Sequence, residues 1–161
     1  ATSDSTFDII CISETWLCDS ISNSEILCPQ IYTTFRCDRN FRQLGISRGG
    51  GVLLAVNNKL QAELLNLSYL CDNITSIEVI GCKFNFKTKP LCIIVAYFSK
   101  TPSVNDLSIF CNFFEEHYNS DSNDLIILGD FNIPFFNMDI NNNVMNTINN
   151  FCRFLNLTQY N

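Results

Sequence analysis

The chain has 161 residues and a formal net charge of −6, and 47% of its residues are apolar. This length suits one domain with a sizeable core, and the composition excludes a disordered chain. The acidic balance argues against a protein that coats nucleic acid through a basic surface, but not against an enzyme with a metal-filled acidic cleft. No apolar run approaches the ~20 residues of a membrane span, and no signal peptide is visible. We therefore expect an intracellular protein, nuclear or cytoplasmic, with no membrane partner.

Short apolar runs, continuous or alternating, predict strands at residues 7–13, 31–37, 51–57, 75–84, 90–98 and 124–130. Ser103 and Asp106 resemble a capping box, and the apolar spacing that follows predicts a helix over 103–118. Helical spacing predicts a second amphipathic helix, marked by Val144, Ile148, Phe151, Cys152 and Leu155.

Three of the predicted strands, 51–57, 75–84 and 90–98, follow one another without an intervening helix and predict a meander. Because strands and helices do not alternate strictly, we expect an α+β fold with a mainly antiparallel or mixed sheet. The prediction is a single domain over residues 1–161.

The chain has nine cysteines, an odd number, and no two of them have CxxC spacing. Several lie inside apolar runs, such as Cys11 and Cys92. We therefore expect neither a zinc site nor a disulfide framework, but reduced thiols packed in the core.

The stretch "LILGDFNIP", residues 125–133, places Asp130 and Asn132 two apart at the end of a predicted buried strand. Gly129 before them leaves room for the close approach of another backbone or a ligand. If the strand continues through Asp130, both polar side chains point to the same side. Two interpretations stay open, an Asx turn that caps the strand or an active site.

Glu14 directly follows the predicted strand 7–13, where a carboxylate alone is an ordinary loop residue. If the strands 7–13 and 124–130 are neighbours, Glu14 and Asp130 converge at one sheet edge. Two carboxylates and an amide, without thiolate or imidazole, suit a hard cation such as Mg²⁺, which favours phosphoryl chemistry.

Four motifs in this order, "IICISETWL", "GGGVLLAV", "IIVAYFSKTPS" and "IILGDFNIP", resemble the endonuclease/exonuclease/phosphatase superfamily. Within it, the chain is most similar to the apurinic-type endonuclease domain of non-LTR retrotransposons, from Phe7 to Asn161. The resemblance implies a four-layer α/β/β/α sandwich that hydrolyses phosphodiester bonds of DNA with Mg²⁺, or with Mn²⁺ in its place. In a full-length element it also implies a reverse transcriptase domain on the same polypeptide.

The resemblance assigns roles to four residues. Glu14 corresponds to a metal ligand, and Asp130 to the residue that orients or deprotonates the attacking water. Asn132 corresponds to the residue that holds the phosphate and that water, and Tyr97 to a contact with the scissile phosphate.

Two further features have less specific roles. The pair Asp38-Arg39 resembles the family's "R-x-DR" stretch, so Arg39 is a candidate substrate-binding residue that either contacts the DNA backbone or forms a structural ion pair. The glycine run at 49–51 lacks the Lys-Ser/Thr of a P-loop, and predicts close backbone packing without a ligand.

Family members also carry a metal-binding Asn on a preceding strand and an "SDH" motif whose His binds the phosphate, and neither is among these 161 residues. The only histidine, His117, falls on the predicted helix 103–118, where a solvated or helix-end role is expected. The resemblance thus implies a domain truncated at both ends. Since one preorganised donor contributes roughly 10²–10³ in rate, we expect the 161 residues alone to be inactive or nearly so.

Two alternative functions stay open. One is a phosphatase or phosphodiesterase of the same superfamily that acts on a substrate other than nucleic acid, for example an inositol phosphate. The other is a decayed or domesticated remnant without catalytic activity.

Overall fold

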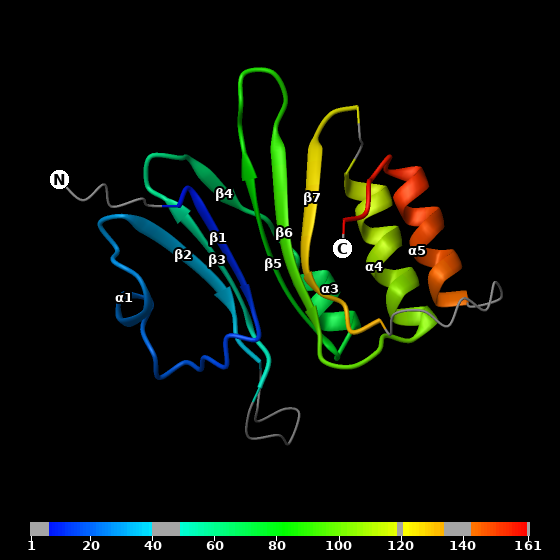
Figure 1. Cartoon of the computed structure of the whole chain (residues 1–161), viewed down its shortest axis with the longest axis horizontal. Helices are drawn as coiled ribbons and strands as arrows, with labels where there is room; N and C mark the ends of the chain where they lie inside the picture. Colours follow the sequence, from blue (N-terminus) through cyan, green and yellow to red (C-terminus); the bar gives the residue numbers. More distant parts are fainter. Residues whose placement is uncertain (1–6, 40–48, 119–120, 134–142, 161) are drawn as a thin grey trace.

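The computed structural model describes residues 7–39, 49–118, 121–133 and 143–160, which form two β-sheets packed face to face (Figure 1). Sheet A is antiparallel and has the order β1-β3-β2, formed by β1 (Ile9–Ser13), β3 (Val52–Asn57) and β2 (Tyr32–Cys37). Sheet B has the order β4-β5-β6-β7, formed by β4 (Ala62–Leu64), β5 (Ile77–Phe84), β6 (Leu91–Phe98) and β7 (Asp124–Asp130). Only the β6–β7 pair in these sheets is parallel.

Three helices lie on the face of sheet B that points away from sheet A (Figure 1): α3 (Ser68–Asn73), α4 (Val104–His117) and α5 (Asn143–Phe154). The helix α4 connects the parallel strands β6 and β7, and its capping box forms as predicted. The Ser103 hydroxyl accepts a bond from the Asp106 N–H at 3.1 Å, and a carboxylate oxygen of Asp106 accepts one from the Ser103 N–H at 3.3 Å. None of the described helices is long and apolar enough to cross a membrane.

Aromatic side chains fill the layer between these helices and sheet B. The Phe110 ring of α4 lies at the centre, with ring-centroid distances of 5.7 Å to Phe98, 4.8 Å to Phe114 and 6.3 Å to Phe151. Between the two sheets, the buried residues Val52, Leu54 and Val56 of β3 face an apolar row of sheet B. Strand β3 is buried along its whole length because it has a strand on either side and packing on both faces.

All six predicted strands and both predicted helices are present, within a few residues of their expected bounds. The predicted mixture of strands and helices with mainly antiparallel pairing is confirmed. Three short elements were not predicted: β4, α3 and α1 (Asn23–Ile26). They are too short to give a periodic apolar pattern of their own.

One of the three strands predicted for the meander belongs to the other sheet. The strand at 51–57 is β3 and belongs to sheet A, while the meander consists of β4, β5 and β6. The short β4 lies in the segment that carries the chain from one sheet to the other, which sequence pattern alone did not reveal.

The expected neighbours 7–13 and 124–130 do not share a sheet. Strand β1 is an edge of sheet A and β7 is an edge of sheet B, and the two strands contact each other across the interface between the sheets. In the described residues, the outer face of sheet A is covered by α1, through Ile26, and by nearby loop side chains such as Leu17. The four-layer sandwich therefore stays a prediction.

Candidate active site

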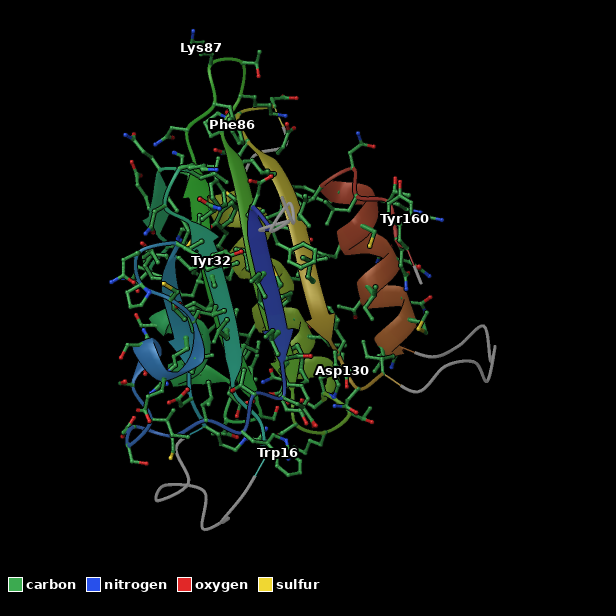
Figure 2. The ribbon with its side chains drawn as sticks, turned by 60° about the vertical axis from the view of Figure 1, so that its left-hand side comes forward. Trp16, Tyr32, Phe86, Lys87, Asp130 and Tyr160 are labelled. Atoms are coloured by element: carbon green, nitrogen blue, oxygen red, sulfur yellow. The ribbon has the colours of Figure 1, made fainter. Side chains whose placement is uncertain are left out.

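The strands that carry the predicted site residues finish at the same end of the two sheets. Figure 2 shows Asp130 and Trp16 at this end, with Phe86 and Lys87 at the opposite end. In sheet B, Glu78 lies opposite Tyr97, and Tyr97 lies beside Asp130. Since neighbouring residues across a ladder share a face, these three form a polar row on the side of sheet B that faces sheet A. We call this region the polar end.

Glu14 reaches this row from sheet A. The Tyr97 hydroxyl donates a hydrogen bond to a carboxylate oxygen of Glu14. Tyr97 is only 4% exposed and packs against the apolar interior between the sheets. Burial first, and then the bond to Glu14, raise the pKa of Tyr97, while Arg39 opposes this shift. The hydroxyl is therefore held in its protonated, donating form.

Arg39 forms a buried ion pair with Glu78 in the same region. Its Nε donates to Glu78 Oε1 at 2.5 Å and its Nη2 donates to Glu78 Oε2 at 2.9 Å, a bidentate arrangement. The hydrogen bonding that Arg39 donates to Glu78 is the main cause that raises the pKa of Arg39. The Arg39 guanidinium carbon also lies 5.4 Å from the Tyr97 ring centroid. Arg39, held by Glu78, thus packs on the Tyr97 ring.

The glycine run makes room for this guanidinium. Gly50 has a φ of +75°, and a Cβ there would lie 2.2 Å from the Cζ of Arg39. The Gly50 carbonyl also accepts a bond from the Trp16 N–H at 2.9 Å, and the Gly51 carbonyl accepts one from the Thr15 N–H at 3.2 Å. The prediction of close packing is confirmed, and it explains why this segment follows β1 so closely.

Asp130 and Asn132 form a turn. The Asp130 Oδ1 accepts a bond from the Asn132 N–H at 2.9 Å, which is an Asx turn. Asn132 has a φ of +48°, and its amide Nδ2 donates to the Phe98 carbonyl at 2.6 Å. Strand β7 runs through Asp130, as predicted, and ends there, so Asn132 belongs to the turn that follows the strand. Both residues are nevertheless exposed beside Tyr97, so the turn and the site coincide.

Backbone strain gathers at the same end. In the described chain, four non-glycine residues have positive φ: Glu14, Trp16, Asn132 and Asn156. Three of these four belong to the two loops that leave β1 and β7. Such conformations cost about 1–3 kcal/mol each and are typical of active sites and ligand clamps. Asn adopts such a φ readily in turns, so the strain at Glu14 and Trp16 is what favours a functional role at this end.

The donors at the polar end fit Mg²⁺ better than a metal that needs a cluster of side chains. Within the described ranges, no group of three or more His, Cys, Asp or Glu side chains converges as a metal site. Mg²⁺ does not need one, because it keeps several waters and binds through one or two carboxylates together with substrate phosphate. The exposed Glu14, whose carboxylate is oriented by Tyr97, fits this requirement.

The structure brings together Glu14, Tyr97 and Arg39 directly, and Asp130 by its place beside Tyr97. Sequence reasoning missed Glu78. The sequence pattern that could have indicated Glu78 is an acidic residue at the start of a strand face that is otherwise apolar. The other residues on that face are Ile80, Cys82 and Phe84. His117 lies in the last turn of α4, stacked on Phe113 with a ring-centroid distance of 4.5 Å, in agreement with its predicted helix-end role.

No family model matches the chain, and no curated protein does. D. rerio TDP2 complexed with a single-strand DNA product is similar in structure, with a TM-score of 0.52 and 11% identity over 87% of this chain and 51% of that chain. A humanized D. rerio TDP2 with 14 mutations gives a TM-score of 0.47 and 12% identity over 80% of this chain and 53% of that chain. The chain thus spans about half the length of these proteins. The first similarity supports the expected endonuclease/exonuclease/phosphatase-like fold.

Proposed function

We propose that this chain belongs to a Mg²⁺-dependent phosphodiesterase that hydrolyses DNA, of the type found in non-LTR retrotransposons. The observation that carries the proposal is the hydrogen bond from Tyr97 to Glu14, beside Asp130, at the strained polar end. The likeness in fold to a protein solved with a DNA product favours DNA as the substrate. The motifs "SETWL" and "GGGVLLAV" favour the retroelement branch, and with it an intracellular location and a reverse transcriptase on the same polypeptide.

In this proposal, Glu14 holds the metal and Asp130 accepts the proton of the attacking water. Bound Mg²⁺ supplies charge that polarises a phosphoryl oxygen and lowers the pKa of a coordinated water. Asn132, anchored through its Nδ2 to the Phe98 carbonyl, orients the phosphate with its second Nδ2–H and accepts a hydrogen bond from the attacking water with its Oδ1. Tyr97 keeps its proton and donates it in a hydrogen bond, first to Glu14 and then to the phosphate. Arg39 acts through Tyr97, because Glu78 occupies two of its donors.

The proposed reaction needs stabilisation of the negative charge that develops on the phosphate. His117 makes a contact within α4 with the Phe113 carbonyl, 2.8 Å from its Nδ1, and is not part of the polar end. We therefore assign the donors of this stabilisation to Tyr97 and Asn132 and not to His117; one preorganised donor contributes about 10²–10³ in rate.

Metal binding at Glu14 tests the proposal without relying on turnover. Trp16 is the only tryptophan and lies two residues from Glu14, so its fluorescence reports on this loop. We expect a saturable change with Mg²⁺ that is absent in Glu14→Gln and kept in Glu116→Gln, a control on the exposed side of α4. An unchanged response in Glu14→Gln would remove Glu14 from the proposed metal site.

A nucleic-acid substrate is tested separately. Fluorescence anisotropy of a labelled single-stranded oligonucleotide in Mg²⁺ should rise with added protein, and inositol phosphates should not compete. Competition by inositol phosphates would instead favour a phosphodiesterase for small substrates. Metal and DNA binding without any nicking of supercoiled plasmid, even over long incubation, would favour a non-catalytic remnant. Any nicking should disappear in Asp130→Ala.

A further inference from the structure

A large aromatic side chain lies exposed at the polar end, beside the candidate metal ligand. Trp16 stands two residues after Glu14, so their Cα atoms are at most about 7 Å apart. Trp16 is 48% exposed. Figure 2 shows it at the same end of the molecule as Asp130, beyond the ends of the strands. A molecule bound at Glu14 is therefore within reach of the Trp16 ring.

The backbone that carries Trp16 is held on both sides. The Trp16 N–H donates to the Gly50 carbonyl at 2.9 Å, and the Leu17 N–H donates to the Thr15 hydroxyl at 3.4 Å. Leu17 packs against the buried cluster on the outer face of sheet A. Thr15 fits closely against Gly51, where a Cβ would lie 2.5 Å from the threonine hydroxyl oxygen. The two neighbours of Trp16 thus anchor the loop, while its own side chain stays exposed.

The conformation of Trp16 is unusual for its side chain. Its φ of +57° lies in the left-handed region, where a bulky residue is rarely found, and such strain gathers at ligand clamps. Single exposed aromatics are ordinary on protein surfaces. Phe86, 49% exposed at the opposite end, is one of them: it stacks on Phe84 and is not among the described residues with positive φ. Strain, anchoring and the place beside Glu14 distinguish Trp16 from it.

The charge of the protein favours a partner for this ring that needs no cation. The net charge is −6, and the two arginines at the end of β2 are already paired. Arg36 lies 3.1 Å from Asp38, and Arg39 is held by Glu78. Little of their positive charge is left for phosphates. A nucleobase instead offers a π-face, and stacking on one aromatic side chain raises affinity by roughly five- to a hundredfold per base.

We propose that Trp16 is a stacking platform for one unpaired nucleobase next to the phosphodiester bound at Glu14. The inference rests on the proposed function and narrows its substrate to DNA that is single-stranded or locally unpaired at the cleavage site. In a duplex, each base is covered on both faces by its neighbours, so it must leave the stack before an aromatic ring can reach it. The anchored loop presents the indole in one position, so little freedom is lost when a base stacks on it.

The fluorescence of Trp16 tests the proposal on the unmutated protein. Trp16 is the only tryptophan, so quenching by added DNA is assigned to its ring. In EDTA, where neither metal binding nor hydrolysis contributes, a short oligothymidylate should quench the emission saturably. A strand of the same length that is abasic throughout should bind several-fold more weakly and quench little. Equal quenching by the two strands, or none by either, would overturn the proposal.

Substitution then separates the ring from its backbone. Trp16→Gly removes the indole and suits the positive φ, so the fold should be kept. We expect about tenfold weaker binding of labelled oligothymidylate by anisotropy, with an unchanged dependence on salt, because stacking releases no counterions. Trp16→Phe should restore most of the affinity. Phe86→Ala, the matched control at the opposite end, should leave it unchanged.

Two results with these variants contradict the platform. One is an equal loss of affinity in Phe86→Ala, and the other is a weaker salt dependence in Trp16→Gly, which would indicate lost phosphate contacts. The proposed function can fail separately. A Mg²⁺ response that survives in Glu14→Gln removes the metal site but leaves the platform supported if oligothymidylate still quenches Trp16. Conversely, metal binding at Glu14 with unchanged oligothymidylate affinity in Trp16→Gly overturns the platform alone.

Discussion

The two ends of the β6–β7 pair carry similar groups in different surroundings. Where the strands begin, Lys89 and Asp124 form a surface ion pair of 2.8 Å, with side-chain exposures of 29% and 62%. Where they finish, Arg39 and Glu78 form a bidentate pair with exposures of only 7% and 6%. Exposed pairs contribute little to stability, whereas breaking a buried pair leaves a costly unpaired charge. An ion pair therefore contributes little to stability where the two strands begin, and its loss costs much where they finish.

Two hollows on the surface formed by the described residues lie away from the polar end. The larger one, of about 410 Å³, is lined by Thr33, Phe35, Asn58 and Gln61 with apolar neighbours, where β2 begins and β3 ends. It has no charged side chain in its lining, and no strained residue among those described. Surface hollows alone would therefore not identify the polar end as a candidate site. Its charged side chains, backbone strain and hydrogen bonds do.

The largest expected effect comes from Gly129→Ala at the end of β7. A Cβ there would lie 1.8 Å from the Ala96 carbonyl oxygen, and the φ of +136° is strained for alanine. We expect a loss of about 4 kcal/mol in the free energy of unfolding, measured by urea denaturation. Ser122→Ala, in the exposed turn before β7, is the control and should change stability little. Near-equal stabilities would mean that β6 and β7 do not approach so closely.

Glu78→Ala should be the next largest. It leaves the buried Arg39 guanidinium without its carboxylate, which costs about 3 kcal/mol in unfolding free energy. The double variant Arg39→Met with Glu78→Leu should recover most of this loss, since it removes both charges and keeps the volume. Failure of the double variant to recover would indicate that packing, and not the unpaired charge, dominates.

Tyr97→Phe should cost about 1 kcal/mol at neutral pH, because it removes the hydrogen bond from the buried Tyr97 to the exposed Glu14. The pKa of Tyr97 is raised in the folded state, so its contribution is complete below the unfolded tyrosine pKa of about 10. As pH rises through the folded pKa, the contribution is lost. Urea denaturation of both proteins at increasing pH should therefore show converging stabilities in the alkaline range, and parallel curves would contradict this assignment.

The smallest effect belongs to the other end. Lys89→Ala should change the unfolding free energy by at most about 0.5 kcal/mol, with little dependence on salt beyond about 0.5 M, where exposed pairs are screened. A loss in unfolding free energy as large as that of Glu78→Ala would mean that the exposed and the buried ion pair contribute equally to stability.

The sequence predicted the elements well because their patterns are local. The capping box at Ser103, the buried run of β3 and the amphipathic spacing of α5 are each readable within a few residues. The division of the strands between two sheets could not be predicted in this way, since it depends on pairings such as Ile10 with Ala55, far apart in sequence. The contact of Glu14 with Tyr97 across the sheets and the pairing of Arg39 with Glu78 were hidden for the same reason.

The free edge of strand β7 affects how readily the protein self-associates. It is the outermost strand of sheet B among the described residues, and Ile126 and Leu128 are each 42% exposed on it. Such an edge invites pairing with a second copy, which proteins limit with charges at the strand. In an antiparallel pairing of two copies centred on Ile127, Asp130 would face Asp124 of the other copy, and like charges directly opposite are destabilising. The carboxylate proposed for hydrolysis therefore also protects solubility, and Asp130→Ala should self-associate at lower concentration than the unmutated chain.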